Sequence, residues 1–300
     1  MIPRRHLHHA LLLALIAVPV AAQTPQVTVI TLGTGGPNPL PDRQGPATAV
    51  TVGERVFLFD AGTGVERQLN AAHLPISGPT ALFLTHLHSD HTLGLADLIL
   101  TSWVMRRTRP FPIYGPAGTE AMVDHLMAAY AEDIKIRTEG LEHEVRGGER
   151  VTVHRVRAGV VFDSGGVRIT AIPVPHGSWA EAYGYLIEAP GRRILISGDT
   201  RYSEALERAA AGVDVLVHEV YPSTRSAREA RPGGDDWPAY LRSFHTSDDD
   251  LGGLAQRAQP KLLVLTHVVR MGAPNSEVVA GVRRGGYTGP LVVAKDLDRF

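Results

Sequence analysis

The stretch "LFLTHLHSDHTLGL", residues 82–95, places three histidines and an aspartate within six positions directly after an apolar run. His86 and His88 are two positions apart, so a short extended turn can point both the same way. Asp90 and His91 begin the segment that follows and can face a second ion. Imidazole and carboxylate groups are ligands for zinc, iron and manganese. The stretch predicts one wall of a metal site; the alternative is a polar loop with a chance cluster.

Three further candidate ligands follow β-rich runs elsewhere in the chain. His176 follows "ITAIPVP", Asp199 follows "RRILISG" and His267 follows "KLLVLT". A polar residue at the end of an apolar strand is how a rigid scaffold presents site residues on loops. Each of the three alone suits a structural role better. Together with residues 86–91 they indicate a site for two ions, in which a carboxylate bridges the pair, and Asp199 is the candidate bridge.

The composition limits the classes of protein and of ligand. The chain has 300 residues, of which 44% are apolar and 20% charged, as in ordinary folded α/β proteins. Its formal net charge is -1, so we expect no nucleic-acid partner. It contains no cysteine, so any metal must be held by His, Asp or Glu.

The first 22 residues have the pattern of a secretory signal peptide. Arg4 and Arg5 provide a positive start, an apolar stretch follows, and small residues end at Ala22. The apolar stretch is short for a membrane span, although an uncleaved anchor is the alternative. We therefore expect a periplasmic or secreted protein without stable membrane insertion, and a single domain over residues 23–300.

The remaining pattern predicts two packed β-sheets with helices outside. Several early strands are separated by turn residues alone, which favours antiparallel neighbours, whereas later strands alternate with helices. The stretch 225–238 reads as a surface loop. Predicted strands lie at 26–33, 47–53, 55–62, 80–86, 167–175, 182–189, 192–199, 213–219, 261–267 and 290–294. Predicted helices lie near 91–106, 117–132, 202–211, 247–258 and 275–284.

Seven short motifs occur in one order along nearly all of the chain after residue 22. They are "LGTGGPNP", "FDAGTG", "THLHSDH", "PVPHG", "SGDT", "HE" and "LTH". In this the sequence resembles the metallo-β-lactamase superfamily, and within it the ribonuclease Z and secreted arylsulfatase branch. The resemblance implies an α/β fold, the αββα sandwich of two mixed β-sheets flanked by helices. It also implies one zinc held by His86, His88 and His176, another held by Asp90, His91 and His267, and a bridging Asp199.

Other residues near these motifs have candidate roles. The turn "GTGG", residues 33–36, is predicted to lie at the rim of the site, and Asp60 in "FDAGTG" is predicted to orient a ligand histidine. Glu219 and His245 resemble the ribonuclease Z pattern, in which the histidine assists the leaving group and the glutamate orients it. The alternative for His245 is a helix-capping role, because "HTSDDD" begins a helix. Four side chains near these motifs are candidates for holding an anionic group: Arg201, Tyr221, Arg225 and Arg270.

We therefore expect an exported hydrolase of ester bonds with two zinc ions, or iron or manganese in their place. A water activated between the ions is the expected nucleophile, and Asp90 would help orient it. The expected substrate is a small anionic ester, with an arylsulfatase-like or phosphodiesterase-like activity. Alternatives are a β-lactamase, a lactonase or thioesterase of the same fold, and a non-catalytic metal-binding protein. The chain could also form a homodimer.

Overall fold

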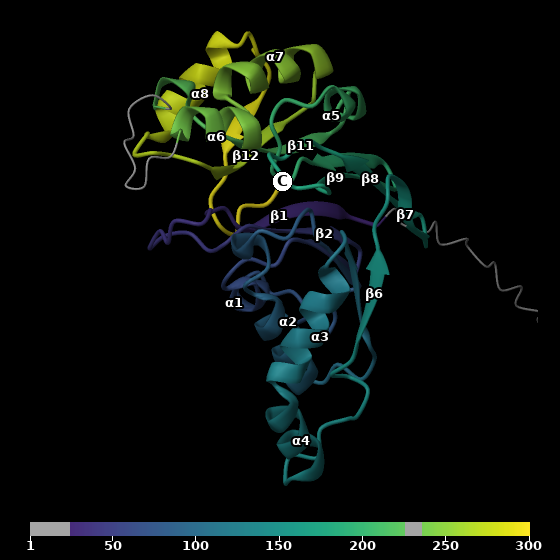
Figure 1. Cartoon of the computed structure of the whole chain (residues 1–300). Helices are drawn as coiled ribbons and strands as arrows, with labels where there is room; N and C mark the ends of the chain where they lie inside the picture. Colours follow the sequence, from purple (N-terminus) through teal and green to yellow (C-terminus); the bar gives the residue numbers. More distant parts are fainter. Residues whose placement is uncertain (1–24, 226–235) are drawn as a thin grey trace, which may run out of the picture.

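A computed structural model describes residues 25–225 and 236–300 (Figure 1). The predicted signal peptide, residues 1–22, lies outside these residues, as does most of the predicted loop 225–238. No helix in the described ranges combines the length and apolar character that a membrane crossing requires.

The first half of the chain forms a six-stranded sheet in which the strands follow the order of the sequence. The strands are β1 (Val27–Gly33), β2 (Ala47–Val52), β3 (Arg55–Phe59), β4 (Ala81–Phe83), β5 (Phe111–Gly115) and β6 (Val151–Arg155). β1 to β3 pair antiparallel, and β3 to β6 pair parallel. The outer face carries α1 (Val65–Ala71), α2 (Leu95–Val104) and α3 (Thr119–Ala129), and α4 (Ala131–Glu139) projects beyond them (Figure 1).

The second half forms a seven-stranded sheet with the order β13-β12-β11-β10-β9-β8-β7. Its strands are β7 (Gly159–Ser164), β8 (Val167–Pro173), β9 (Tyr183–Ala189), β10 (Arg192–Ile196), β11 (Val215–Val220), β12 (Leu263–Val268) and β13 (Leu291–Val293). β7 to β10 pair antiparallel and β10 to β13 parallel. Its helices are α5 (Glu204–Ala209), α6 (Trp237–Phe244), α7 (Asp248–Ala258) and α8 (Asn275–Arg284) (Figure 1).

The two sheets pack face to face around one apolar core. In β8 the residues Val167, Ile169 and Ala171 alternate with less buried neighbours, as expected for a strand with one face in a core. The same core takes side chains from both sheets, and the rings of Phe59 and Tyr185 lie 5.6 Å apart across it. Separate apolar clusters join each sheet to its own helices. The predicted αββα sandwich of two mixed sheets is confirmed.

The ten predicted strands are present, but the structure adds three more, β5 to β7. β5 reads "FPIYG", and its internal proline weakens the strand pattern. α4 has no buried residue, so it shows no apolar period from which a helix could be predicted. The helix expected from residue 91 begins at Leu95, after a separate 3-10 turn at Ser89–His91.

Candidate metal centre

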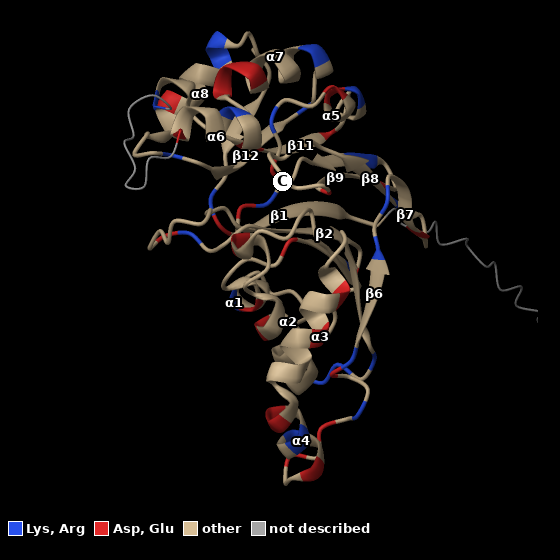
Figure 2. Cartoon of the chain, in the orientation of Figure 1, with Lys and Arg blue, Asp and Glu red and all other residues tan. Residues whose placement is uncertain are grey.

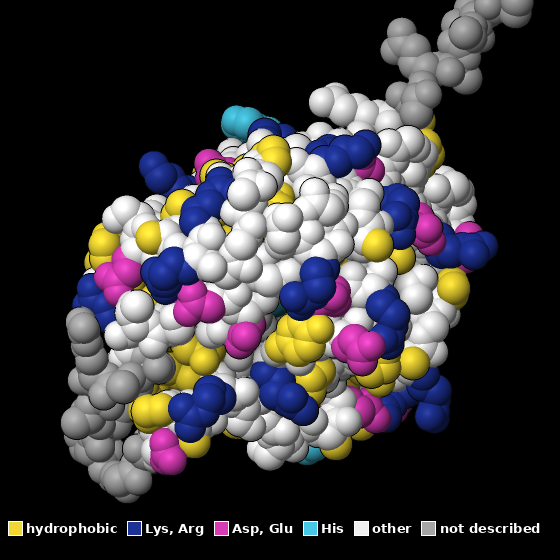
Figure 3. All heavy atoms as spheres, turned by 90° about the horizontal axis from the view of Figure 1, so that it is seen from above, with side chains coloured by type: hydrophobic (Ala, Val, Ile, Leu, Met, Phe, Trp, Pro, Cys, Tyr) yellow, Lys and Arg dark blue, Asp and Glu magenta, His cyan; other side chains and the backbone are white. Residues whose placement is uncertain are grey.

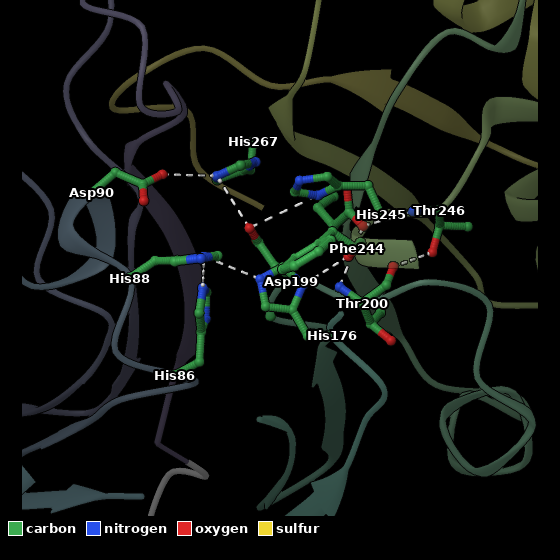
Figure 4. Close-up of polar contacts among 12 residues, drawn as sticks. His86, His88, Asp90, His176, Asp199, Thr200, Phe244, His245, Thr246 and His267 are labelled. Atoms are coloured by element: carbon green, nitrogen blue, oxygen red, sulfur yellow. Dashed lines mark hydrogen bonds and ion pairs between the residues drawn. The ribbon is translucent and has the colours of Figure 1, made fainter. Parts of the chain in front are cut away.

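Ligand atoms of His86, His88, His176 and Asp199 all lie within 4.8 Å of one another. His86 Nε2 lies 2.9 Å from His88 Nδ1, and His176 Nε2 lies 3.1 Å from the same atom (Figure 4). The first two histidines follow β4, whereas the others follow β8 and β10 of the second sheet. This first ligand group therefore forms only where the ends of strands from both sheets meet.

A second ligand group consists of Asp90, His91 and His267, which also satisfies the 4.8 Å limit. Asp90 Oδ2 lies 3.2 Å from His267 Nε2 and 3.7 Å from His91 Nε2. Asp199 Oδ2 lies 3.4 Å from both of these ring nitrogens, and Figure 4 shows its contact with His267. The carboxylate of Asp199 thus belongs to the first group and reaches both histidines of the second, the position that a bridging ligand requires.

A hydrogen-bond relay from Asp60 fixes the orientation of two ring nitrogens. His91 Nδ1 lies 2.8 Å from Asp60 Oδ2 and donates its proton there. Thr85 Oγ1 donates to the same carboxylate and accepts from His86 Nδ1 at 3.0 Å. With both Nδ1 atoms protonated, the Nε2 atoms of His86 and His91 carry the lone pairs, and these point toward the other candidate ligands of each group. The predicted orienting contact of Asp60 with a candidate ligand histidine is confirmed.

The turn after β8 sets the other two histidines of the first group. His176 Nδ1 donates to the backbone oxygen of Phe244 at 2.7 Å, which leaves its Nε2 free to bind a metal. Gly177 has φ 53, and a Cβ there would lie 2.0 Å from the Phe244 ring, so only glycine fits. The turn brings Trp179 Nε1 to 2.8 Å from His88 Nε2, and the indole donates. In this arrangement the ring proton of His88 is on Nδ1, and a metal bound at Nδ1 would displace it.

The electrostatics of the second group favour positive charge. Burial alone would lower the pKa of His267, but Asp199 and Asp90 raise it to about 9. Burial alone would raise the pKa of Asp199, but the charges on His267 and His91 hold it well below its usual range. Among the described residues, His91 Nε2 is buried without a hydrogen-bond partner. A divalent cation supplies the charge and the partner that these atoms lack, so the residues present fit a metal.

Two residues of the candidate site carry backbone strain. Asp60 has φ 61 and His267 has φ 41, a left-handed conformation that costs a non-glycine residue on the order of 1–3 kcal/mol. Both residues lie at or beside the end of a strand, where the chain turns toward the ligand groups. In both residues the strained backbone sets the direction in which the side chain leaves the strand end.

Glu219 and His245 form a buried pair beside the Asp199 carboxylate. Glu219 Oε2 lies 3.3 Å from His245 Nδ1, and Glu219 Oε1 accepts from the backbone N–H of Thr246 at 2.8 Å. Burial raises the pKa of Glu219 well above its usual range and lowers the pKa of His245 to about 4. His245 Nδ1 is also 3.9 Å from Asp199 Oδ2, so the ring could alternatively join a metal. It is the C-cap of α6, whereas Ser247 caps α7 through its side chain.

A cavity of about 320 Å³ opens on the ligand groups. Gly36 lines it, which places the "GTGG" turn at the rim as predicted. Of the four candidate anion-holding residues, Arg270 lines the cavity, whereas Arg225 pairs with Glu277 at 2.6 Å. The sequence did not point to Trp179 or to the aromatic side chains of α6, since neither forms a ligand motif.

Residues 55–268 match the family model described as "Beta-lactamase superfamily domain", and the chain belongs to this superfamily. Within it, the chain is 34% identical over 274 residues to ribonuclease Z of Mycobacterium bovis, an alignment that covers 89% of this chain and 95% of the relative. It is 36% identical over 263 residues to ribonuclease Z of Mycobacterium sp. (strain KMS), which covers 84% and 87%.

Solved structures show the same fold at lower identity. A metallo-β-lactamase fold protein from Bacillus subtilis superposes with a TM-score of 0.71 at 17% identity, over 93% of this chain and 99% of the other. The short form of human tRNase Z gives 0.68 at 22% identity, over 91% and 98%. The predicted superfamily and its ribonuclease Z branch are confirmed.

The expectation of no nucleic-acid partner is wrong. The two relatives described above, at 34% and 36% identity, are ribonucleases by name. The expectation relied on the net charge of the whole chain, which is a poor guide because charges of both signs are spread over the molecule (Figure 2). On the face that carries α7 and α8, basic and acidic side chains are interspersed (Figure 3). Recognition of one phosphodiester depends on the local charge at the site, and the net charge of the whole chain does not report that local charge.

Proposed function

We propose that this chain is a metal-dependent phosphodiesterase that acts on RNA. The observation that carries the proposal is the position of Asp199, whose carboxylate lies between two complete ligand groups at the end of a cavity. The ribonuclease Z relatives support the choice of a phosphodiester over the sulfate ester that the arylsulfatase resemblance suggested. They also support an enzyme over a non-catalytic metal-binding protein.

His86, His88 and His176 would hold one ion, Asp90, His91 and His267 the other, and Asp199 both. Two divalent ions bound there activate water and stabilise negative charge on a phosphate group. Nitrogen and carboxylate ligands without sulfur suit zinc, and also iron or manganese. Elemental analysis of protein purified without chelator should give about two ions per chain and identify the metal.

The chain's own residues divide the remaining work. Asp90 lines the cavity and can orient the attacking water through the oxygen that does not face His267. His245 also lines the cavity, and Glu219 positions its ring through Nδ1. Burial favours a neutral His245 and a protonated Glu219, so the pair holds one proton. Transfer of that proton through His245 to the departing oxygen would complete the hydrolysis, a contribution of about 10²–10⁴-fold. In this role Glu219 positions His245 rather than touching the substrate.

A substrate panel tests the proposal. The zinc-loaded protein is incubated with a short RNA, an aryl phosphodiester, an aryl sulfate, a lactone and a β-lactam, and product formation is followed by chromatography. We expect RNA or the aryl phosphodiester to be cleaved fastest. Asp199→Asn should abolish that activity, whereas Asp163→Asn, an exposed change on β7, should not. Fastest turnover of the sulfate or the β-lactam would disprove the proposed reaction.

A further inference from the structure

Three aromatic side chains of α6 form a row beside the metal centre. Trp237 and Tyr240 stack with ring centroids 4.9 Å apart and planes inclined by 10°. Tyr240 and Phe244 stack at 4.5 Å and 22°. The spacings of three and four residues place all three on one side of the helix. Phe244 continues the row to the candidate ligand His176, whose ring lies 5.0 Å away.

Two members of this row, Trp237 and Tyr240, face the cavity rather than one of the three main cores. Trp237 and Tyr240 line the cavity of about 320 Å³, together with Arg270 and Met271. They belong to a small separate apolar cluster in which Trp237 Nε1 contacts Met271 Sδ at 3.1 Å. A volume near the lower end of the range for small-molecule sites, about 300–1,000 Å³, admits one ring and its ester group.

The chemistry of the walls suits a flat aromatic group. Aromatic edges carry partial positive charge and pack against ring faces in edge-to-face pairs. On the cavity wall formed by Arg270, the guanidinium is half-buried, and its Nη2 has no hydrogen-bond partner among the described residues. A guanidinium also stacks on ring faces. The Tyr240 ring lies 5.8 Å from the His245 ring, so this wall borders the side from which His245 reaches the substrate.

We propose that the cavity is a nucleobase subsite, in which Tyr240 and Arg270 bind the base attached to the phosphate on the side of His245. The subsite rests on the proposed function, since it names the part of the RNA substrate that the same site selects. Phe244 and His245 lie on the same side of Asp199, away from Asp90 (Figure 4). A phosphate at the ligand groups would therefore direct its base along the aromatic row of α6. Tyr240 is a specificity-determining residue in this arrangement.

The test measures binding and does not require turnover. Adenosine monophosphate and ribose 5-phosphate carry the same phosphate on the same sugar, and only the first has a base. With the zinc-loaded full chain, calorimetry should show adenosine monophosphate binding about tenfold more tightly, near the upper limit for one edge-to-face pair between the Tyr240 ring edge and the face of the base. Tyr240→Leu should make the two affinities equal, whereas Tyr240→Phe should retain the preference. Tyr130→Leu, a change of a partly exposed tyrosine next to α4, is the matched control and should also retain it.

Two results would overturn the subsite. One is equal binding of the two ligands by the wild-type chain, and the other is a base preference that survives in Tyr240→Leu. Failure of the proposed function is seen separately in the substrate panel. It would appear as absence of RNA and phosphodiester cleavage, while calorimetry still shows a preference for the ligand with the base. Circular dichroism of Tyr240→Leu verifies that α6 and the fold are intact.

Discussion

The substitution Asp60→Asn tests whether one buried carboxylate sets the metal-binding form of His91. Asp60 Oδ2 accepts from His91 Nδ1 at 2.8 Å, and Oδ1 accepts from the Thr85 backbone N–H at 2.8 Å. Both oxygens act only as acceptors. Asparagine has nearly the same size but replaces one acceptor oxygen with an NH₂ donor. The variant therefore cannot satisfy both neighbours at once.

Either orientation of the new amide has a cost that can be estimated. If the NH₂ group faces His91, the ring proton moves to Nε2, the atom that faces Asp90 and Asp199, and a metal cannot bind there. If it faces Thr85, two donors meet in the protein interior, which costs about 1–3 kcal/mol. Loss of a partner that orients a ligand histidine costs about 10–100-fold in metal affinity, or about 1.4–2.8 kcal/mol. Metal binding at His91 Nε2 requires the second orientation, so the cost of the two facing donors would appear as weaker metal binding. The two estimates of that loss therefore cover the same range.

Competition with a chromophoric zinc chelator measures the affinity of each ion separately. Asp60→Asn should bind its second ion about 10–100-fold more weakly and its first ion nearly as the wild type does, since His86 keeps its partner Thr85. Asp163→Asn serves as the control, because Asp163 is exposed and pairs only with Arg168 in the described structure. Unchanged affinity for both ions would refute the orienting role, and equal loss at both would indicate general loosening instead.

Three further predictions concern single side chains. His245→Ala should slow cleavage of esters with alkoxide leaving groups about 10²–10⁴-fold more than nitrophenyl esters, with both ions retained. Glu66 is buried with its pKa raised to about 8, mainly by desolvation, from 4.5, so the unfolded chain loses a proton that the folded chain keeps. Stability should therefore fall by about 1.4 kcal/mol per pH unit between those values, and Glu66→Gln should remove this dependence in urea titrations. A zinc ion at His88 Nδ1 moves the ring proton to Nε2, which can then no longer accept from the indole N–H of Trp179. Zinc binding should therefore change the tryptophan fluorescence, and Trp179→Phe should abolish that change.

Each of these has a result that would contradict it. Equal losses on both kinds of ester would deny His245 the role of acid, and loss of an ion would make it a ligand instead. A Glu66→Gln variant with the pH dependence of the wild type would show that the carboxyl is ionised in the folded chain. Trp237→Phe is the control for the fluorescence experiment, and it should retain the change caused by zinc.

The ligand groups were predictable from the sequence because each member follows an apolar run that reads as a strand. The motif at residues 86–91 fixes four of them through local spacing alone. Trp179 and Tyr240 were not predictable in this way, because their roles depend on contacts across the fold. Trp179 reaches a residue 91 positions earlier in the chain, and α6 follows a stretch without a strand or helix pattern. Net charge misled the prediction of partners because it averages over the whole surface.

The pairing of distant ligands also sets an order for maturation of the protein. Asp90 and His267 meet across 177 positions of sequence, and each ligand group needs side chains from both halves. A nascent chain on the ribosome therefore has the residues of its first ligand group once Asp199 has emerged, but it lacks His267 of the second group until β12 has emerged. An ion captured at the second group before that point would lack His267 and would exchange more freely. Tight occupancy by the second ion thus reports that β12 has joined its sheet and that the two halves have docked.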